Sequence, residues 1–419
     1  MKKTLLIAAS LLVLCSSAMM AQDSSKPTLK PYGFFRSYAF FDSRSTKSLT
    51  EDMFFFIPLD EKIVGGNDVN AVSSFNYQAI TTRLGLDVTG YKVGQTKING
   101  KIETDFYCLN SSGNTGTLRM RQAYVDLLWD GRGEKGTTDM SLRVGQSWHP
   151  LAADMAHTIS LETAAPFSPF NRSAQLMFNA TFNKRTTFTA GLIQQLQYRS
   201  NGPQGSTNKY QRHAVPEFYV GLSYKEGAFL GRVGLDVLSI RPQYGYNEAG
   251  KKYDEWLTTF TPFVFLQYTK GLFQVKAKTV LAQSGEHMQL NGGYCATALK
   301  SDGISYEYTP IRSSVNFISL QYGKTWQVLG MLGYQRNLGT TKDIMADRIY
   351  FSGNGFKEIL QMVRFSPTVA YNLGKCQFAF EFDYTTVQYG SNLSSRALVQ
   401  DNLHWIPNIR LLGMLKYTF

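Results

Sequence analysis

Beyond its first residues, the sequence lacks any long uninterrupted apolar run, and this absence argues against a helical membrane protein. A membrane-spanning helix needs roughly 18 or more consecutive apolar residues, and no such run follows residue 21 of this 419-residue chain. Charged residues are scarce as well, at 18% of the chain. The scarcity does not indicate disorder, because 28 Phe and 24 Tyr supply ample apolar material for burial.

Cysteine is also rare. The chain has four cysteines, and three of them, Cys108, Cys295 and Cys376, lie outside the amino-terminal apolar segment. Their odd number and wide spacing argue against a disulfide framework, and no CxxC or Cys/His cluster indicates a zinc site. We therefore expect no cofactor and no metal. A bridge between Cys108 and Cys295 stays open, because both would lie near the outer rim of the fold described below.

The first residues have the pattern of a secretory signal. Two lysines precede an apolar run from Leu5 to Leu14, and Ala21 supplies a small residue at the end. A basic start, about ten apolar residues and a small residue before the cleavage site are typical of an export signal. We expect residues 1–21 to be a signal peptide that is cut before Gln22.

Alternation of apolar and polar residues runs through most of the remaining chain. Leu84 and Leu86 alternate with Arg83 and Asp87, and the same pattern recurs over residues 376–384. Because successive side chains of a strand point to opposite faces, each segment has one apolar and one polar face. In a soluble sandwich the apolar face would form the core, whereas in a membrane barrel it contacts lipid and the polar face lines water.

Connection lengths favour the barrel. About sixteen alternating segments occur, the first starting near Tyr32 and the last near His404. Tight turns such as residues 183–185 and 373–375 separate the long connections, which include residues 43–76, 149–172, 199–215 and 283–311. Short periplasmic turns that alternate with long extracellular loops are typical of outer-membrane barrels, and a soluble sandwich has no reason to sort its loops in this way.

We therefore predict an all-β fold, a transmembrane antiparallel barrel of about 16 strands over residues 32–419, preceded by a short periplasmic segment at residues 22–31. Tyr417 and Phe419 share one face of the last segment, and an aromatic residue that closes such a strand resembles the recognition signal of the barrel assembly machinery. This machinery, together with the lipid and lipopolysaccharide of a Gram-negative outer membrane, is an expected partner.

The polar face should line the path of a solute, because about sixteen strands enclose an aqueous channel. Acidic residues on this face are Asp42, Asp87, Glu103, Asp105, Glu381 and Asp383. Basic residues are more numerous: Arg36, Arg83, Lys101, Arg119, Arg121, Arg143, Lys276, Lys278, Arg364, Arg410 and Lys416. Cationic walls favour anions. For each residue alone, pairing with a neighbouring acid is the favoured interpretation; for the surplus as a group, anion selectivity is favoured.

Five segments agree in order and spacing with one family of outer-membrane proteins, over roughly the first 180 residues. They are residues 33–44 (GFFRSYAFFDSR), 83–87 (RLGLD), 102–107 (IETDFY), 118–124 (LRMRQAY) and 144–148 (VGQSW). Here the chain resembles the DcaP-like outer-membrane porins. The resemblance implies a trimeric sixteen-stranded channel for small, often anionic solutes such as dicarboxylates, with a basic lumen wall at Arg36, Arg83, Arg119, Arg121 and Arg143. Some members carry a helical extension before the barrel, which we do not expect here, because only residues 22–29 precede the first strand.

Two of the long connections have unusual sequences. In sixteen-stranded porins the third loop folds into the channel, so residues 149–172 are a candidate constriction loop, and an ordinary exposed loop is the equal alternative. Its candidate residues are His149, Asp154, His157, Glu162 and Arg172. The first loop contains an apolar run, Met53 to Leu59, which is expected to pack into the barrel mouth or against a neighbouring subunit.

We expect an outer-membrane porin for passive diffusion of small, dicarboxylate-like anions, assembled as a homotrimer. A surface-binding or adhesive barrel is the alternative, and an outer-membrane enzyme is a weaker one. Among the five histidines only His149 and His157 suggest a catalytic pair, and neither lies in a nucleophile or metal motif. We therefore expect no enzymatic activity. The net charge of +12 would suit nucleic acid, but an exported chain whose basic residues face inward is not expected to bind it.

Overall fold

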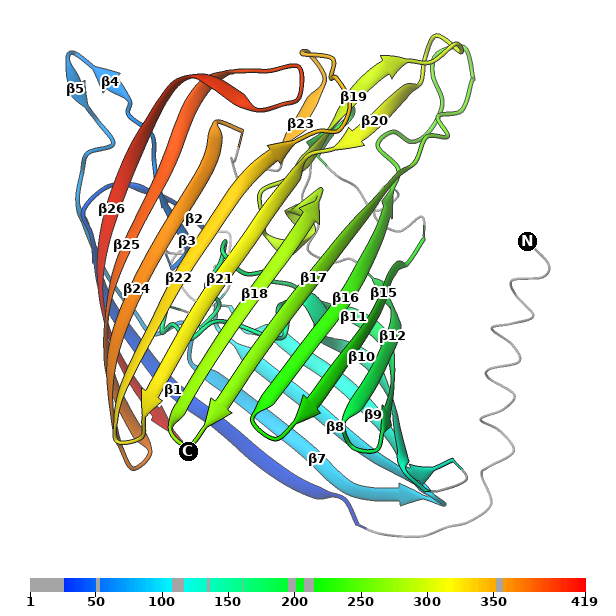
Figure 1. The fold of residues 1–419 in the computed structure, drawn as a ribbon, viewed down its shortest axis with the longest axis vertical. Coiled ribbons are helices and arrows are strands. Elements are labelled where there is room, and N and C mark those ends of the chain that lie inside the picture. The colour runs from blue at the N-terminus through cyan, green and yellow to red at the C-terminus, as the bar shows by residue number, and fades with distance from the viewer. Residues whose placement is uncertain are drawn as a thin grey trace.

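The strands of the chain wrap into a closed barrel in the computed structural model (Figure 1). The structure describes residues 26–49, 53–107, 117–133, 136–160, 162–194, 201–206, 215–351 and 357–419. Within these ranges, no helix has the length and apolar character needed to cross a membrane. The predicted signal peptide and Cys108 lie outside the described residues, so the open question of a bridge to Cys295 is not addressed.

The wall is one antiparallel sheet in which strands that follow one another along the chain also pair, and β1 returns to pair with β26. Its strands are β1 (Thr28–Asp42), β6 (Ser74–Gln78), β7 (Arg83–Val93), β8 (Thr96–Asp105), β9 (Arg119–Arg132), β10 (Thr138–Trp148), β11 (Arg172–Phe182), β12 (Thr186–Gln194), β15 (Glu217–Glu226), β16 (Phe229–Ile240), β17 (Leu257–Lys270), β18 (Phe273–Gln283), β21 (Arg312–Gly323), β22 (Trp326–Gly339), β24 (Ile359–Leu373), β25 (Cys376–Leu393) and β26 (Val399–Thr418).

These 17 strands fill sixteen positions around the barrel, because β6 and β7 share one position. The outer part of β1 pairs with β6, from Tyr38 to Asp42, and its first part pairs with β7, from Thr28 to Phe34. A turn at residues 79–82 separates the two strands. The predicted barrel of about 16 strands is confirmed, although one of its positions is interrupted.

Two strands are longer than the alternation predicts. β1 begins at Thr28 rather than near Tyr32, because residues 28–31 already pair with residues 86–89 of β7. β26 begins at Val399 rather than near His404, because Val399 and Asp401 already pair with Leu393 and Ser391 of β25.

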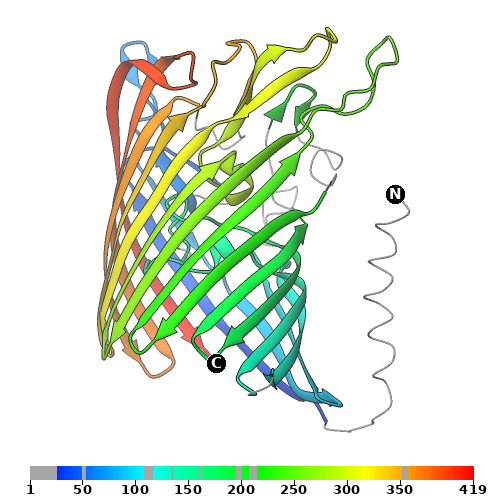
Figure 2. The same ribbon diagram turned by 45° about the vertical axis from the view of Figure 1, so that its right-hand side comes forward.

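The two ends of the barrel differ in the length of their connections. Tight turns lie at the end where the carboxyl terminus is marked in Figure 1, and the long loops rise at the other end, as Figure 2 also shows. Glycine makes such turns possible, since Gly271 and Gly374 have φ angles of +58° and +59°. The long connections contain β2 (Thr46–Leu49), β3 (Phe54–Pro58), β4 (Ile63–Val64), β5 (Asn67–Asp68), β13 (Asn201–Gly202), β14 (Gly205–Ser206), β19 (Gly293–Leu299), β20 (Tyr306–Pro310) and β23 (Ile349–Phe351).

Along each strand of the wall, successive side chains point alternately to the outer and the inner face. In β25, Phe378 and Phe380 are exposed on the outer face, whereas Glu381 and Asp383 are buried on the inner face. β17 carries bulky residues on both faces, because its inward Phe263 packs against inward segments of the chain. An apolar exterior over a polar interior is the arrangement of a membrane barrel.

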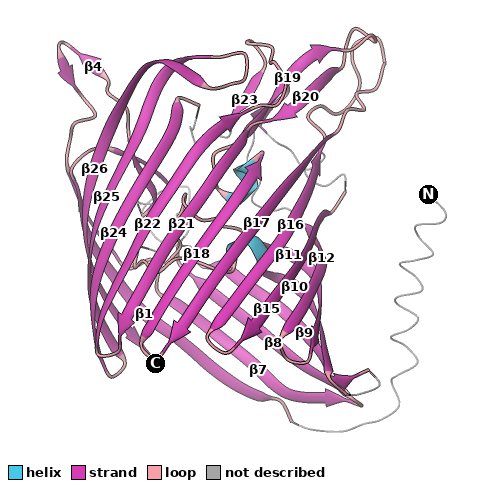
Figure 3. Cartoon of the chain, viewed as in Figure 1, coloured by secondary structure: helices cyan, strands magenta, loops and turns pink. Residues whose placement is uncertain are grey.

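Apolar clusters lie inside the ring of strands as well as on its outer face. Two short 3₁₀ helices, η1 (Pro150–Ala152) and η2 (Gly285–Met288), belong to long connections and carry buried side chains (Figure 3). Leu151 of η1 and Met288 of η2 belong to the same buried cluster as inward residues of the wall. The long loops therefore fill part of the interior.

Candidate solute path in the barrel interior

Residues 149–171, which we call the inward loop, cross the interior from β10 and β11 to the opposite wall. Tyr38 of β1 donates a hydrogen bond from its hydroxyl to the carbonyl oxygen of Ile159 over 2.7 Å. The carboxylate of Glu381, in β25, accepts hydrogen bonds from the backbone N–H groups of Ile159 and Ser160. Inward-facing side chains of the far wall thus hold the middle of this loop.

The apolar run of the first loop also lies inside the barrel. Met53 to Ile57 are buried, and all of them except Phe56 share a cluster with Tyr38 and Phe40 of β1. The ring of Phe56 lies between two guanidinium groups, with Arg364 at 3.7 Å and Arg410 at 4.0 Å from its centroid. Contact of cations with an aromatic face is favourable, so the run packs against the polar inner face of the wall.

A third segment, around η2, closes over the end of the inward loop. The backbone N–H of Phe170 donates to the carbonyl oxygen of Met288 over 2.9 Å. The side chain of Asn171 donates to the carbonyl oxygen of His287 over 2.6 Å. The first loop, the inward loop and the connection between β18 and β21, which contains η2 and which we call loop six, are therefore packed within the same interior.

A cavity of about 440 Å³ remains beside the inward loop. It lies toward the tight-turn end, because its lining includes Gln327 and Gln377, each the second residue of its strand. Its two acidic side chains are Asp105 and Glu162. Its six basic side chains are Arg36, Arg83, Arg119, Arg121, Lys276 and Lys416. Among the described residues that line it, positive charge is thus in clear surplus.

Most of these charges are paired. Arg121 contacts both Glu103, at 2.8 Å, and Asp105, at 2.6 Å. Asp105 also pairs with Arg119 at 2.9 Å, and Glu103 lies 3.8 Å from Arg83. Two carboxylates therefore serve three guanidinium groups, so pairing across the wall fixes the side chains and still leaves a positive excess.

Glu162 places one negative charge of the inward loop in this cavity. It pairs with Arg36 at 3.1 Å and with Lys416 at 3.4 Å. Loss of water contacts would raise the pKa of Glu162, but the charges of Arg36, Lys416 and Arg83 outweigh this effect and lower it to about 2. The carboxylate is therefore ionised at neutral pH.

His157, in the same loop, carries no charge at neutral pH. Burial lowers the pKa of its imidazole, and the nearby charge of Lys276 lowers it further, to about 4. The ammonium of Lys276 itself donates to the carbonyl oxygen of Met155 over 3.1 Å. The lining of the cavity therefore includes the neutral imidazole of His157 and, near it, the cationic ammonium of Lys276.

Two predicted pore-lining residues lie outside this cavity. Arg143 lines a second cavity of about 350 Å³, which shares Trp148 and Ala153 with the first, and it pairs with Asp126 at 2.8 Å. Lys101 pairs with Asp87 at 2.8 Å and donates to the hydroxyl of Tyr32.

Two other predicted pore-lining residues support loops instead of facing a cavity. Lys278 is buried, and its ammonium donates to the carbonyl oxygens of Leu151 and Asp154. Arg364 is also buried, and its guanidinium donates to Phe55 and Ala165 over 2.6 and 2.9 Å. The alternation correctly gives their direction, but the inward segments cover them.

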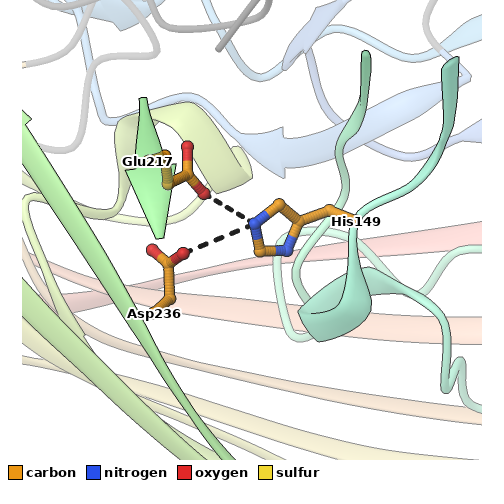
Figure 4. Close-up of side chains that lie close together, drawn as sticks. All are labelled: His149, Glu217 and Asp236. Atoms are coloured by element: carbon orange, nitrogen blue, oxygen red, sulfur yellow. Dashed lines mark hydrogen bonds and ion pairs between the residues drawn. The ribbon is translucent and has the colours of Figure 1, made fainter. Parts of the chain in front are cut away.

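The remaining candidate residues of the predicted constriction loop, residues 149–172, have structural partners. Asp154 pairs with Arg232 of β16 at 2.8 Å. The guanidinium of Arg172 lies 4.8 Å from the ring centre of Trp148 and 5.3 Å from that of Phe170. His149 is buried at the root of the loop and faces two carboxylates that the sequence did not single out, Glu217 and Asp236 (Figure 4). Both occupy inward positions of their strands, so the alternation was the available signal.

The carboxyl-terminal aromatics lie on the outer face. Tyr417 and Phe419 are exposed, and the ring of Phe419 lies 5.4 Å from that of Phe35. The backbone N–H of Phe419 donates to the carbonyl oxygen of Gly33 over 3.1 Å, so the last residue takes part in the closure of the barrel. Recognition of this end by the assembly machinery stays a prediction.

No protein-family model matches the chain, and a sequence search of curated proteins finds no match. Solved structures do match. The outer membrane channel DcaP of Acinetobacter baumannii is 17% identical, with a TM-score of 0.67 over 94% of this chain and 97% of that chain. An anion-selective porin from Comamonas acidovorans is 9% identical, with a TM-score of 0.55 over 94% and 100%. The trimer form of OmpT, an outer membrane protein of Vibrio cholerae, is 11% identical, with a TM-score of 0.50 over 94% and 99%. The chain therefore has the fold of outer-membrane porins, and its resemblance to the DcaP-like porins is confirmed at the level of the fold.

Proposed function

We propose that this chain is an outer-membrane porin that passes small anionic solutes, dicarboxylates among them, by passive diffusion. The observation that carries the proposal is the charge of the cavity beside the inward loop, with six basic and two acidic lining side chains. Fixed cations in a narrow water-filled passage with low-dielectric walls attract anions and repel cations. The fold shared with a porin named as anion-selective is consistent with this proposal.

The inward loop acts as the constriction in this proposal. It contributes Glu162 and His157 to the cavity, opposite the arginines of β1, β7 and β9. A dicarboxylate that passes here meets guanidinium groups able to bind a carboxylate through two parallel hydrogen bonds. Because Glu103 and Asp105 already hold these groups in position, little side-chain ordering is needed when the solute arrives.

The experiment is planar-bilayer conductance of the purified chain under a salt gradient. We expect stable channels whose reversal potential shows anion preference. Arg119→Glu combined with Arg121→Glu should abolish that preference, and Lys251→Glu combined with Lys252→Glu, on an exposed outer loop, is the matched control. An unchanged reversal potential in the cavity variant would contradict the assignment of these arginines.

A second variant guards against a folding defect, since Arg121 is buried between two acids. Lys276→Gln removes a lining charge whose described hydrogen bond is to a carbonyl group, so no carboxylate loses its cation. We expect a smaller loss of anion preference in a barrel of normal stability. Cation preference in the wild-type channel would contradict the anionic-solute proposal. Absence of conductance in the wild-type barrel would favour an adhesive or enzymatic barrel.

Assembly as a homotrimer in the outer membrane, after export by the amino-terminal signal, completes the proposal. The apolar outer face supports a location in lipid, and one structure with this fold is described as a trimer. The mass of the detergent-solubilised native protein, measured by light scattering, tests the assembly. A monomeric protein mass would rule out the trimer and leave the channel proposal standing.

A further inference from the structure

Four buried polar side chains meet at the root of the inward loop, away from the basic cavity. His149 begins the loop, Glu217 opens β15, Asp236 lies on β16 and His287 lies in η2. At most 1% of any of these residues is exposed. Four separate segments supply them, so no short sequence motif marks the group, which we call the root cluster.

The hydrogen bonds of His149 place its proton. Its Nδ1 accepts a hydrogen bond from the backbone N–H of Leu151 over 3.1 Å, so Nδ1 carries no proton. The proton therefore sits on Nε2, which lies 2.6 Å from Glu217 and donates to it. Figure 4 shows this edge of the ring turned toward both carboxylates. His149 thus donates to Glu217 and orients it.

His287 has the opposite arrangement. Its Nδ1 lies 3.2 Å from the carbonyl oxygen of Ser284, which can only accept, so Nδ1 carries a proton. Its Nε2 then faces Asp236 at 3.4 Å and Glu217 at 4.0 Å. An imidazole that donates one ring N–H to a backbone carbonyl and turns its other nitrogen toward carboxylates has the orientation of a metal ligand.

Asp236 supplies a second, independent observation. Its Oδ1 is buried and accepts no hydrogen bond from any described residue, although His149 Nε2 lies 3.5 Å away. A buried carboxylate oxygen without a hydrogen bond is destabilising unless a cation serves it. One atom from each of His149, Glu217 and Asp236 lies within 4.8 Å of the other two, so the carboxylates converge on a common point.

We propose that the root cluster binds one divalent transition-metal ion of the zinc class, with Glu217, Asp236 and His287 as ligands and His149 as a positioning residue. In the metal-bound form both imidazoles are neutral, and Glu217 and Asp236 supply two negative charges that one divalent cation neutralises. The separations of 3.4 and 4.0 Å from His287 Nε2 are near the spacing of roughly 3.3 Å expected between ligands about 2.0–2.1 Å from a tetrahedral Zn²⁺. Calcium needs more oxygen ligands than this group offers, and magnesium favours oxygen over imidazole.

Such an ion would join three parts of the interior. It would tie β15 and β16 of the wall to loop six through His287, and to the inward loop through the bond of His149 to Glu217. Binding requires only the folded barrel and no solute, so this proposal is independent of the proposed channel activity.

The experiment uses the full folded chain in detergent, stripped with a chelator and titrated with ZnCl₂, and separately with CoCl₂ as a spectroscopic probe. We expect one Zn²⁺ per chain and visible Co²⁺ absorption that Zn²⁺ removes. Asp236→Asn and His287→Gln should abolish both signals. His149→Gln should weaken Zn²⁺ binding by roughly 10–100-fold, the usual effect of losing a residue that orients a ligand. His404→Gln, at a histidine that pairs with Asp60 in the outer loops, is the matched control.

Folding of each variant is checked first by the mobility of the unheated barrel in gel electrophoresis. The wild-type titration stands on its own where a variant does not fold. Failure of the wild-type chain to take up one equivalent, or equal uptake by folded Asp236→Asn, His287→Gln and wild-type proteins, would overturn the proposal. The root cluster would then be an ionic network without metal.

Discussion

The two sides of the barrel interior use the same residue type in different ways. On the side of β7–β10, Arg83, Arg119 and Arg143 keep 16, 28 and 33% of their side chains exposed and contact acids of neighbouring strands. On the side of β24–β26, Arg364 and Arg410 are buried under the apolar run of the first loop. We call these the cavity side and the packed side. An inward arginine is a partly exposed fixed charge on one side and a support for loops on the other.

The difference shows that strand register alone does not assign a role to an inward cation. What covers the residue decides its role. Glu103 and Asp105 hold Arg83 and Arg119 from within the wall, and Asp126 holds Arg143 in the same way, so these groups stay partly exposed. Arg364 instead donates to carbonyl oxygens of two loops that cover it, so its guanidinium is shielded from water. The following predictions test this comparison.

The largest effect is expected from Arg364→Ala on the packed side. The change leaves Asp383 and the carbonyl oxygens of Phe55 and Ala165 without this donor in a buried site. Removal of one partner of a buried ionic group costs about 3–5 kcal/mol, and the freed loops should widen the channel. Urea unfolding in detergent and single-channel conductance measure the two effects. Equal stability and conductance would show that the packed side does not depend on this residue.

A smaller effect on the packed side is expected from Gly333→Ala in β22. A Cβ added at Gly333 would lie 2.6 Å from Cγ of Phe167, whose buried ring belongs to the inward loop. Overpacking of this kind costs about 1–3 kcal/mol. Gly330→Ala, on the same strand, is the matched control, because the nearest atom to its new Cβ is 4.0 Å away. Urea unfolding of both variants should separate them, and equal destabilisation would refute the close fit of Phe167.

The smallest effect is expected from Glu162→Gln on the cavity side. Removal of one of two lining acids should strengthen anion preference at pH 7, whereas Glu307→Gln, in an exposed pair with Lys342, should not. Reversal potentials under a salt gradient measure both variants. Weaker anion preference after Glu162→Gln would mean that this carboxylate does not face the solute path.

The pH dependence of the wild-type channel gives the same test without a mutation. The pKa of Glu162 is lowered from its usual 4.5 to about 2, so its ion pairs with Arg36 and Lys416 contribute fully above pH 4.5 and are lost as the pH falls through about 2. We therefore expect no contribution from Glu162 to any change in reversal potential between pH 7 and pH 4. In that range wild-type and Glu162→Gln curves should run parallel, and convergence above pH 4 would contradict the pairing.

The sequence predicts the wall of the barrel well, because a strand repeats every two residues. β12 starts at Thr186 and β25 at Cys376, directly after the tight turns predicted at residues 183–185 and 373–375. The sequence does not predict the interruption between β6 and β7, because apolar or small residues occupy the even positions of residues 80–88, as in a continuous strand. There Thr82 donates its backbone N–H to Ala79 in a turn, and Thr81 accepts a hydrogen bond from Arg36 on β1. The break thus has a partner 45 residues away in the sequence, which the local pattern does not reveal.

The interior could be predicted only in part, because loops reach it from distant points in the chain. Period two correctly places Lys278 and Arg364 on the inner face, but it carries no information on which loop covers them. The root cluster shows the same limit. The third-loop position marks His149 as a candidate, whereas Glu217, Asp236 and His287 join it only through folding of separate segments.

Arg364 holds two loops with one guanidinium group, and this makes their positions interdependent. If the first loop leaves, Nη2 loses its acceptor at Phe55; if the third leaves, Nη1 loses its acceptor at Ala165. Either departure leaves part of a buried cation unsatisfied and weakens the hold on the loop that remains. We therefore expect the two loops to leave the barrel interior together instead of one at a time.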